Sequence, residues 1–527
     1  MSASPHPTPS GNPKALLALA AAAFLLRLAL LTWGLPLGPE RAWLHPDEHG
    51  VLNHARQFPL SLVFNPEPQY PSGLGVLMRA GMPAPALALS GMEPLLSRES
   101  WDLALTLWGR LLTILLAATL PWSVWRLTRS VADDCAAWTA ATIATFTVWS
   151  ADHACFLTGD AAASALFGLA TWALVELVEH PSRAGSFVAG LAAGAAGSIK
   201  YVAALPLLPA VGLLARRRLA ARAAGDRPGG RARGTELAML AEGALVAVLM
   251  LQPALLVNAQ LTLSVLSREG AIIANHAAMP LRLYAEFVAG TTWWLVGPAA
   301  LLLPVGCLRL ARRGGAGWLL LAMPVLFFVA VRGFYERHMV FVLPVLASIA
   351  GVAVQSRDPR PWRTAAALML VLQCAVTTFT VGQRVCDVRQ SPRFQRQLES
   401  LIPDNARVWA SSGFPSLPGR HVVATGVGDR PDFLLLDSYF EKTYRDAVFV
   451  YRDERTGTVP PKYRWAFFRG TPPEPAELET FSRLFGPPES SDYAEIARFD
   501  QPGSDWLQWF LEFFPYRLRV FARKGSR

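Results

Sequence analysis

Two adjacent carboxylates, Asp47 and Glu48, lie in a polar stretch directly after the first apolar run of the chain. In His45-Pro46-Asp47-Glu48-His49, one carboxylate could serve as a general base while its neighbour orients it or binds a cation. A proline followed by acidic residues is also a favourable helix start, because acidic side chains suit the positive end of the helix dipole. The residues alone do not favour one of these two interpretations over the other.

Histidines are concentrated in the same stretch. His45 and His49 are four residues apart, and His54 follows. Two histidines at this spacing share one face of a helix and could ligate a metal ion, but no third ligand has a fixed spacing to them. We therefore favour ordinary polar histidines here, and the metal ion stays unknown.

A second polar turn contains Asp152, His153 and Asp160. If it faces the same side of the membrane as Asp47, the two acidic turns could hold a divalent cation or bracket a phosphate-linked sugar. The alternative is that Asp160, after Gly159, caps the helix that follows. We favour a functional role, because two acidic turns on one membrane face are less expected than one.

Basic residues form the third set. Arg27 and Arg110 lie inside apolar runs, Lys200 separates two short apolar runs, and Arg337 opens another. Ionisable groups at membrane depth are costly unless they face a polar cavity or pair with one another. They would suit a phosphate group, although a structural pair with an aspartate is credible for Arg27. The position of Lys200 between half-length helices favours a functional role.

Composition indicates the scaffold that must position these side chains. The chain has 527 residues, of which 52% are hydrophobic and 17% charged, whereas soluble domains carry about a quarter charged residues. This excludes a soluble cytoplasmic enzyme, a disordered protein and a disulfide scaffold. The apolar residues predict a mainly α-helical polytopic membrane protein with about eleven transmembrane helices, at residues 16–37, 102–125, 134–151, 160–178, 185–199, 201–215, 236–257, 291–310, 317–331, 338–354 and 363–383.

Arginines in the short connections between these runs predict the orientation. They cluster in three loops, after residues 215, 308 and 356, and basic residues in short loops mark the cytoplasmic side. The net charge of +10 therefore reflects membrane insertion, and we expect no nucleic-acid partner. Residues 1–14 would be a cytoplasmic N-terminus, 15–390 a transmembrane catalytic domain, and 38–101 its first outer loop.

Gly73 to Met92 is apolar but contains Arg79 and two prolines. A single crossing by this segment would invert every later loop against the charge rule. We therefore expect a re-entrant or interfacial pair of short helices.

Residues 391–527 differ in composition and predict a small extracytoplasmic α/β or α+β domain. Its β-like runs are Ala406 to Ser411, Phe433 to Leu436, Tyr463 to Phe468 and Leu518 to Ala522. None of the five cysteines lies in this tail, so we expect neither a disulfide framework nor a thiolate metal site.

The motifs of this chain, and their order along it, resemble those of the GT-C-fold membrane glycosyltransferases that use polyprenyl-phosphate sugars. This group contains the protein O-mannosyltransferases (glycosyltransferase family 39) and the aminoarabinose transferases. His338 replaces a usual tyrosine, and Gly159 stands where proline is common. The matching pieces are His-Pro-Asp-Glu at 45–48, Tyr-Pro-Ser at 70–72, Arg110, Asp152-His153 with Asp160, Gly190 through Tyr201, Glu269 with His276, and Arg337-His338 through Leu343-Pro344.

The resemblance implies an inverting transfer with Asp47 as the general base and Glu48 as its partner. The donor would be a polyprenyl-phosphate sugar, and the acceptor a hydroxyl of a protein, lipid or glycan on the extracytoplasmic face. The donor or acceptor would be oriented by Asp152, His153, Asp160 and His276. These residues could instead hold a divalent metal ion, whose use varies within the group. Lys200, Arg337 and Arg110 would bind the donor phosphate. The arginine- and alanine-rich composition suggests a bacterial inner membrane.

The alternative from another class is a transporter or flippase of a lipid or lipid-linked sugar, because buried charges also mark substrate pathways. Against it, the chain has no recognisable inverted repeat, and Asp47 and Glu48 fall in an outer loop rather than at the midplane. A third interpretation is a membrane anchor that displays the C-terminal tail as an interaction module. It would not explain the number of predicted spans or the charges buried in them.

Overall fold

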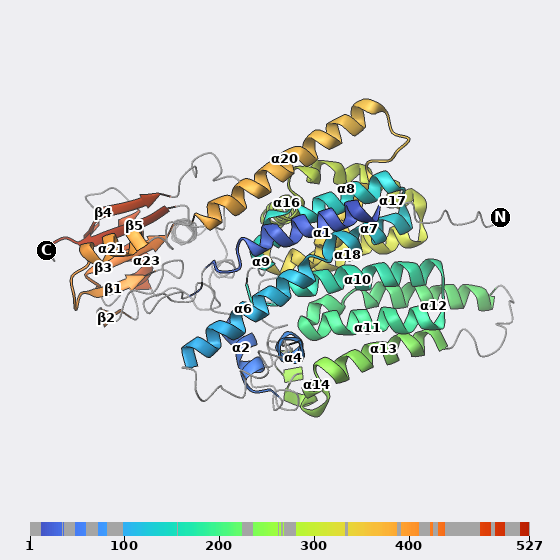
Figure 1. Cartoon of the computed structure of the whole chain (residues 1–527), viewed down its shortest axis with the longest axis horizontal. Helices are drawn as coiled ribbons and strands as arrows, with labels where there is room; N and C mark the ends of the chain where they lie inside the picture. The colour runs from blue at the N-terminus through green and yellow to red at the C-terminus, as the bar shows by residue number, and fades with distance from the viewer. Residues whose placement is uncertain are drawn as a thin grey trace. The chain divides into compact units, whose positions relative to one another are not determined.

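The computed structural model describes most of the chain (Figure 1). The described part divides into a helical unit, which takes most residues up to Val381, and a second unit formed mainly from Gly382 onward. The described residues are 12–33, 35, 48–58, 72–81, 98–154, 156–223, 235–261, 263–264, 267, 281–331, 336–386, 392–410, 422–424, 430–437, 475–485, 491–500 and 517–525.

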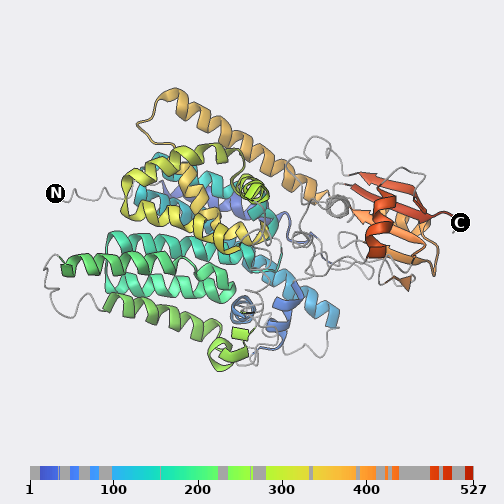
Figure 2. The same cartoon turned by 180° about the vertical axis from the view of Figure 1, so that it is seen from behind.

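In the helical unit, the long helices α10 to α13 lie side by side, and the short helices α2, α4 and α14 lie near one end of this layer (Figures 1 and 2). The described helices are α1 (Pro13–Leu28), α2 (Glu48–Arg56), α4 (Gly73–Ala80), α6 (Arg98–Ala117), α7 (Leu120–Val131), α8 (Asp134–Thr145), α9 (Val148–Ala154), α10 (Asp160–Glu179), α11 (Arg183–Ile199), η2 (Tyr201–Ala204), α12 (Leu207–Ala223), α13 (Thr235–Leu251), α14 (Ala254–Val257), α16 (Leu281–Val296), η3 (Gly297–Leu302), α17 (Leu303–Arg313), α18 (Gly315–Val331), η4 (Glu336–Val342), α19 (Leu343–Val352) and α20 (Arg360–Val385).

Three described helical stretches are long and apolar enough to cross a membrane. They are Ser100–Val131, Asp160–Glu179 and Arg360–Val385, and shorter apolar helices accompany them. The chain is thus a mainly helical membrane protein with a small sheet, as its composition predicts. The number of eleven spans, the domain bounds and the orientation stay predictions.

Several of the predicted spans are built from more than one helix. The span expected at 338–354 consists of η4 and α19, and that at 291–310 falls on α16, η3 and α17. Pro344 and Pro304 are the second residues of α19 and α17, within the first turn, where a missing backbone N–H costs no helical hydrogen bond. The prolines therefore place a new helix start inside each apolar run.

Helices α11 and α13 pack backbone against backbone. A Cβ atom added at Gly190 would lie 2.0 Å from the carbonyl oxygen of Leu240, and one at Gly194 would lie 2.6 Å from that of Ala244. Small residues spaced four apart allow such close contact between membrane helices. Because Lys200 directly follows α11, its backbone is held at a defined place relative to α13.

The apolar segment that begins at Gly73 starts with the eight-residue helix α4. A Cβ atom at Gly73 would lie 2.3 Å from the carbonyl oxygen of Ser198 at the end of α11, and one at Gly75 would lie 2.7 Å from the Cβ of His54 on α2. Helix α4 is therefore packed between α2 and the end of α11. The second expected short helix, up to Met92, lies outside the described residues.

The start of α1, the end of α12 and the start of α20 lie at one end of the helical unit, which we call the basic end (Figures 1 and 2). Asp358, just before α20, accepts hydrogen bonds from Arg309 Nη1 and Nη2 at 2.8 and 2.7 Å, and those bonds hold the pKa of this carboxyl below its ordinary value. Asp133 accepts bonds from the backbone and hydroxyl of Ser356 at 2.8 and 2.6 Å. Although burial acts to raise the pKa of Asp133, these bonds and one from Ala136 leave it lowered.

The second unit contains a five-stranded mixed sheet of order β2-β1-β3-β5-β4. Strand β1 pairs in parallel with β2 and β3, while β5 pairs antiparallel with β3 and β4. Its described elements are α21 (Pro392–Leu401), β1 (Arg407–Ala410), β2 (Val422–Val423), β3 (Phe433–Asp437), α23 (Pro475–Leu484), β4 (Tyr493–Asp500) and β5 (Arg517–Arg523).

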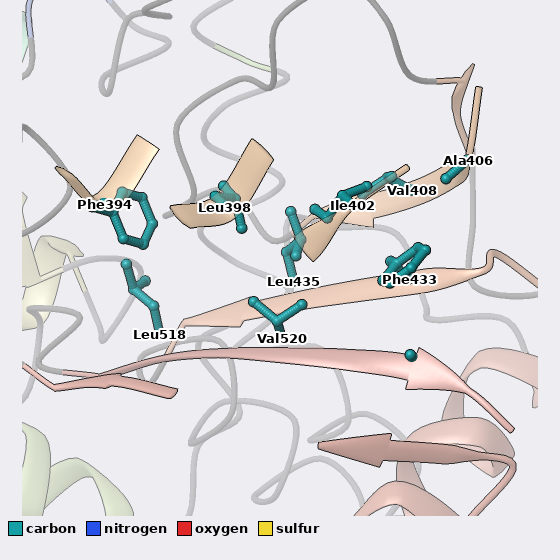
Figure 3. Close-up of a cluster of buried hydrophobic side chains, with 10 residues drawn as sticks. Phe394, Leu398, Ile402, Ala406, Val408, Phe433, Leu435, Leu518 and Val520 are labelled. Carbon is teal, nitrogen blue, oxygen red and sulfur yellow. The ribbon is translucent and has the colours of Figure 1, made fainter. Parts of the chain in front are cut away.

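Both faces of this sheet are covered by a helix. Phe433 and Leu435 of β3 pack with side chains of α21, shown in Figure 3, whereas Leu434 and Leu436 pack with Phe481 of α23. A strand buried on both faces has a continuous apolar sequence, which explains why β3 was predictable.

The runs predicted from Ala406, Phe433 and Leu518 are confirmed as β1, β3 and β5, and the run from Tyr463 lies outside the described residues. Strand β4 was not predicted. It is an edge strand with many exposed residues and an irregularity between Glu495 and Ala497, so it lacks a regular apolar pattern.

Candidate functional site

Glu48 begins α2 and is buried against Arg110 on α6. Its Oε1 and Oε2 atoms accept hydrogen bonds from Arg110 Nε and Nη2 at 2.8 and 2.9 Å. The Nη1 atom of Arg110 also donates to the carbonyl oxygen of Leu31 at 3.1 Å. A two-pronged bond between guanidinium and carboxylate is strong and directional, so it ties the start of α2 to α6.

The turn of residues 156–159, between α9 and α10, adds a third donor to Glu48. The backbone N–H of Leu157 donates to Oε1 of Glu48 at 2.7 Å. A Cβ atom at Gly109, next to Arg110, would lie 2.6 Å from Cδ1 of Leu157, so this side chain lies directly on α6. The turn is therefore anchored to the Glu48–Arg110 pair through both its backbone and its side chain.

Asp160 and Lys200 form a second ion pair next to this turn. Lys200 Nζ lies 2.7 Å from Asp160 Oδ1, the Asp160 side chain is fully buried, and that of Lys200 is 17% exposed. Lys200 has an extended backbone conformation between α11 and η2, so the break predicted at this position is confirmed. The partly exposed ammonium group can donate to a further acceptor, since it carries three N–H groups.

Gly159 allows the turn to connect the two pairs. It has φ of +77° and is itself the N-cap of α10, so Asp160 is the first residue of the helix and not its cap, which is a correction to the capping alternative. Proline, with φ near −65°, cannot adopt this backbone conformation. Within four residues, Leu157 to Asp160, the chain thus contacts both buried ion pairs.

Aromatic rings line the same region. The Arg110 guanidinium lies 6.0 Å from the Phe156 ring centroid. His153 lies 6.2 Å from Phe156 and 4.7 Å from Trp149. His153 is buried within this aromatic set, which fixes the plane of its imidazole ring.

Two polar contacts at the end of α13 had no counterpart in the sequence-based interpretation. Gln252 Nε2 donates to the hydroxyl of Tyr201 at 2.7 Å, and the hydroxyl of Ser72 donates to the carbonyl oxygen of Leu251 at 3.2 Å. These contacts connect Ser72, the last residue of the Tyr-Pro-Ser motif, and Tyr201, which follows Lys200, to the end of α13. The two motifs were recognised separately in the sequence. The polar Gln252 just before Pro253 in an apolar run is the signal that could have revealed this connection.

Other predicted residues are placed only in part. Asp47 and His276 lie outside the described residues, and so do His45 and Glu269. Asp152 belongs to α9 and Arg337 to η4, for which the backbone positions are described. The hydroxyl of Ser164 donates to the carbonyl oxygen of Val340 at 2.9 Å, so η4 contacts α10 one turn beyond Asp160.

Arg27 does not pair with an aspartate among the described residues. It donates to the carbonyl oxygens of Ala23 and Thr145 at 2.8 and 3.5 Å and to the hydroxyl of Ser150 at 2.7 Å. These bonds join α1 to α8 and α9, a structural role. In the part of the chain that the structure describes, no three histidine, cysteine or acidic residues form a metal-binding group.

Comparison with known proteins identifies the central part of this helical unit. Residues 105–224 match the family described as dolichyl-phosphate-mannose-protein mannosyltransferase. The matched segment contains Arg110, Asp160 and Lys200. The family resemblance is thereby confirmed over this segment, and the chain is a glycosyltransferase.

Solved structures with a similar chain trace include ArnT from Cupriavidus metallidurans bound to undecaprenyl phosphate, with 14% identity over 98% of this chain and 99% of that one, and a TM-score of 0.47. The oligosaccharyltransferase from Archaeoglobus fulgidus in complex with zinc and sulfate has 15% identity over 82% and 69%, with a TM-score of 0.45. AglB from the same organism, in complex with an inhibitory peptide and a dolichol-phosphate, has 14% identity over 94% and 81%, with a TM-score of 0.43. Among curated proteins, no sequence matches.

Proposed function

We propose that this protein transfers a sugar, with inversion, from a polyprenyl-phosphate donor to an acceptor hydroxyl, with Asp47 as the general base. The observation that carries the proposal is the bonding of Glu48. Both of its carboxylate oxygens accept bonds from Arg110, and Oε1 also accepts the N–H of Leu157. Glu48 is thereby fixed as a positioning residue, and the carboxylate of its covalent neighbour Asp47 is left to act as the base.

Lys200 is the best supported phosphate ligand. Its ammonium group is partly exposed and uses one described acceptor, Asp160. Arg110 is fully buried and donates to Glu48 and Leu31, so we assign it to holding Glu48 rather than to the donor phosphate. Arg337 stays a phosphate-binding candidate, because η4 contacts α10 close to Asp160.

In the proposed reaction, the acceptor oxygen forms a bond to the anomeric carbon from the face opposite the phosphate. Asp47 takes the hydroxyl proton as the bond between the anomeric carbon and the phosphate oxygen breaks. The electron pair of that bond leaves with the polyprenyl phosphate, whose developing negative charge Lys200 stabilises. The products are the inverted glycoside and the polyprenyl phosphate.

We infer the orientation in the membrane from the arginine-rich helix ends and loops at the basic end. If the arginine-rich ends are cytoplasmic, then α2, α4 and the break at Lys200 face the extracytoplasmic side of a bacterial inner membrane. Asp152, His153 and His276 then remain candidates to orient the donor or acceptor, or to hold a divalent metal ion. The acceptor is a protein, a lipid or a glycan.

The proposal is tested by a transfer assay with the purified protein in lipid. Wild type, Asp47→Asn and the control Asp134→Asn would each receive a panel of radiolabelled polyprenyl-phosphate sugars. We expect wild type and the control to release label from the lipid, because the Arg129–Asp134 pair is partly exposed and contributes little. Asp47→Asn should lose about 10²-fold or more in rate while staying folded.

Normal turnover in Asp47→Asn would contradict the assignment of the base. Label that stays on the lipid but moves between leaflets would favour the flippase.

The test of Lys200 must distinguish the effect of its charge on donor binding from the effect of a broken Asp160–Lys200 pair on folding. In the double variant Lys200→Met/Asp160→Asn, neither charge is left buried without its partner. We expect its KM for the donor to rise about tenfold or more, since a hydrogen bond to a charged group is lost. Asp160→Asn alone, which keeps the ammonium group, should retain most donor binding. An equal rise in KM for both would assign the effect to packing around the pair.

A further inference from the structure

At the basic end, the guanidinium of Arg126 on α7 is surrounded by three tryptophan rings. Its Cζ atom lies 5.7 Å from the ring centroids of Trp122 and Trp125 and 5.8 Å from that of Trp172 on α10. Trp122 and Trp172 also contact each other edge to face, with centroids 5.3 Å apart. We call these four residues the tryptophan cage.

The tryptophan cage presents donors without acceptors. Among the described residues, none accepts a hydrogen bond from the Arg126 side chain, and its Nε atom is buried. The indole Nε1 atoms of Trp125 and Trp172 are likewise buried without a described acceptor. Guanidinium and indole N–H groups can only donate. The group that would satisfy this site is therefore an anion rich in acceptors.

The neighbouring Arg129, in contrast to Arg126, has a counterion among the described residues. Three residues further along α7, the Nε atom of Arg129 lies 2.6 Å from Asp134 Oδ1. Ser130 bonds to Glu176 of α10 and accepts a bond from Arg313 through its carbonyl oxygen. Arg129, Glu176 and Arg313 thus each have a hydrogen-bond or ion-pair partner within the protein, whereas the Arg126 cation has no described acceptor or counterion.

The depth of the tryptophan cage fits a membrane interface. Arg126 lies five residues before the end of α7, or about 7.5 Å along the helix axis, and Trp172 lies seven residues before the end of α10, or about 10 Å. Both helices belong to stretches apolar enough to cross a membrane. Trp122 is exposed, as is Leu115 seven residues earlier. Tryptophan favours the level between the hydrocarbon and the headgroups.

We propose that the tryptophan cage binds the phosphodiester headgroup of an anionic membrane phospholipid, in the leaflet at the basic end. The phosphate oxygens accept from the Arg126 guanidinium, while the exposed ring of Trp122 packs against the lipid's glycerol and acyl carbons. An unpaired guanidinium at this depth is costly, and an anionic headgroup supplies its counterion. This site is separate from the Asp160–Lys200 pair and does not depend on the proposed transfer reaction.

The test measures lipid binding to the full-length protein in a non-ionic detergent by native mass spectrometry. The probes are phosphatidylglycerol, phosphatidylcholine and inorganic phosphate. We expect wild type to bind phosphatidylglycerol more tightly than phosphatidylcholine, and Arg126→Gln to bind phosphatidylglycerol about tenfold or more weakly. The matched control is Arg129→Gln, which removes one positive charge from the same helix end. It should stay within about twofold of wild type, because Arg129 already pairs with Asp134.

If Arg126→Gln does not fold, Trp122→Ala provides the test, because it removes the exposed ring that packs against the lipid and keeps the Arg126 guanidinium. A several-fold loss of phosphatidylglycerol binding would support the proposal, and wild-type binding would overturn it. Equal losses of phosphatidylglycerol binding in Arg126→Gln and Arg129→Gln would mean that binding depends only on the general positive charge of this surface, and would contradict a specific site. Competition by millimolar inorganic phosphate that equals competition by lipid would show an anion site and overturn the lipid assignment.

Discussion

Gly159 is the residue on which the geometry of the two ion pairs depends most directly. Its φ of +77° lies in the left-handed region that favours glycine, and an added Cβ atom would lie 3.2 Å from the Cγ2 atom of Ile199, the residue before Lys200. The departure from proline noted in the sequence is therefore explained, since proline cannot adopt this backbone conformation. A substitution of Gly159 would shift Asp160, the next residue in the chain, and would shift Lys200 by displacing the neighbouring Ile199.

We predict that Gly159→Ala lowers stability by about 1–3 kcal/mol, because the alanine would be held in a strained backbone conformation. It should also raise the donor KM, because Lys200 is displaced relative to Asp160. The measurements are thermal unfolding in detergent and transfer kinetics.

The control for Gly159→Ala is Gly212→Ala. Gly212 lies inside α12 with nothing within 4 Å of an added Cβ atom. It should be neutral or slightly stabilising, since alanine favours helix. Equal stability of both variants would mean that the turn at Gly159 can relax without cost.

At the scale of elements, the basic end is held by carboxylates that bind the connections between helices. Asp358 fixes the segment before α20 to α17 through Arg309 and also accepts the backbone N–H of Gln355 at 2.6 Å. Asp133 joins the α7–α8 turn to the same segment through Ser356. Since the pKa of each carboxyl is lowered, each stabilises the fold in its ionised form.

The sign of the pH dependence follows from this lowering. The contribution of Asp358 is fully present above the carboxyl's ordinary pKa of 3.8 and is lost as the pH falls through the lower folded pKa. We predict that Asp358→Asn costs about 1 kcal/mol at neutral pH. Its unfolding temperature should begin to approach that of wild type as the pH falls below about 4, and the gap should narrow further as the pH falls through the lower folded pKa. Thermal unfolding from pH 7 to pH 3 measures this.

Asp134→Asn is the control for Asp358→Asn, because its pair with Arg129 is more exposed and should contribute less. A constant difference between wild type and Asp358→Asn across this pH range would contradict the role of the ionised carboxylate.

At the scale of the whole molecule, each unit has a core of its own. The described core of the sheet-containing unit is built from residues between Phe394 and Ala522, with Leu435 and Leu434 fully buried on opposite faces of β3. The helical unit buries its own apolar residues, such as Phe167 and Phe327, with ring centroids 5.3 Å apart. Two such cores predict two separate unfolding transitions.

We predict that Leu435→Ala destabilises the sheet-containing unit by about 2–5 kcal/mol, because it leaves a cavity in that core. The transition of the helical unit should be unchanged. Hydrogen exchange followed by mass spectrometry would assign each transition to its peptides. Val385→Ala is the control, since this side chain is mostly exposed. A loss of protection in both units with Leu435→Ala would show that they unfold together.

The sequence by itself determined the class of protein and the residues of interest. Long apolar runs require a membrane, and an ionisable side chain inside such a run stands out by type alone, which is how Arg110 and Lys200 were recognised. Strands β1, β3 and β5 were predictable because their apolar character is local. Asp47 was selected from sequence and from the family resemblance, and stays a prediction.

The tertiary structure decided which of these charges pair. Glu48 is 62 residues from Arg110 and 109 from the N–H of Leu157, and Asp160 is 40 residues from Lys200. It also showed that Arg126 has no described counterion while Arg129 has one. Local patterns report whether a residue is apolar or charged. Its partner, however, depends on which helix faces come together, and this is determined by close packing at residues such as Gly190 and Gly159 over the whole fold.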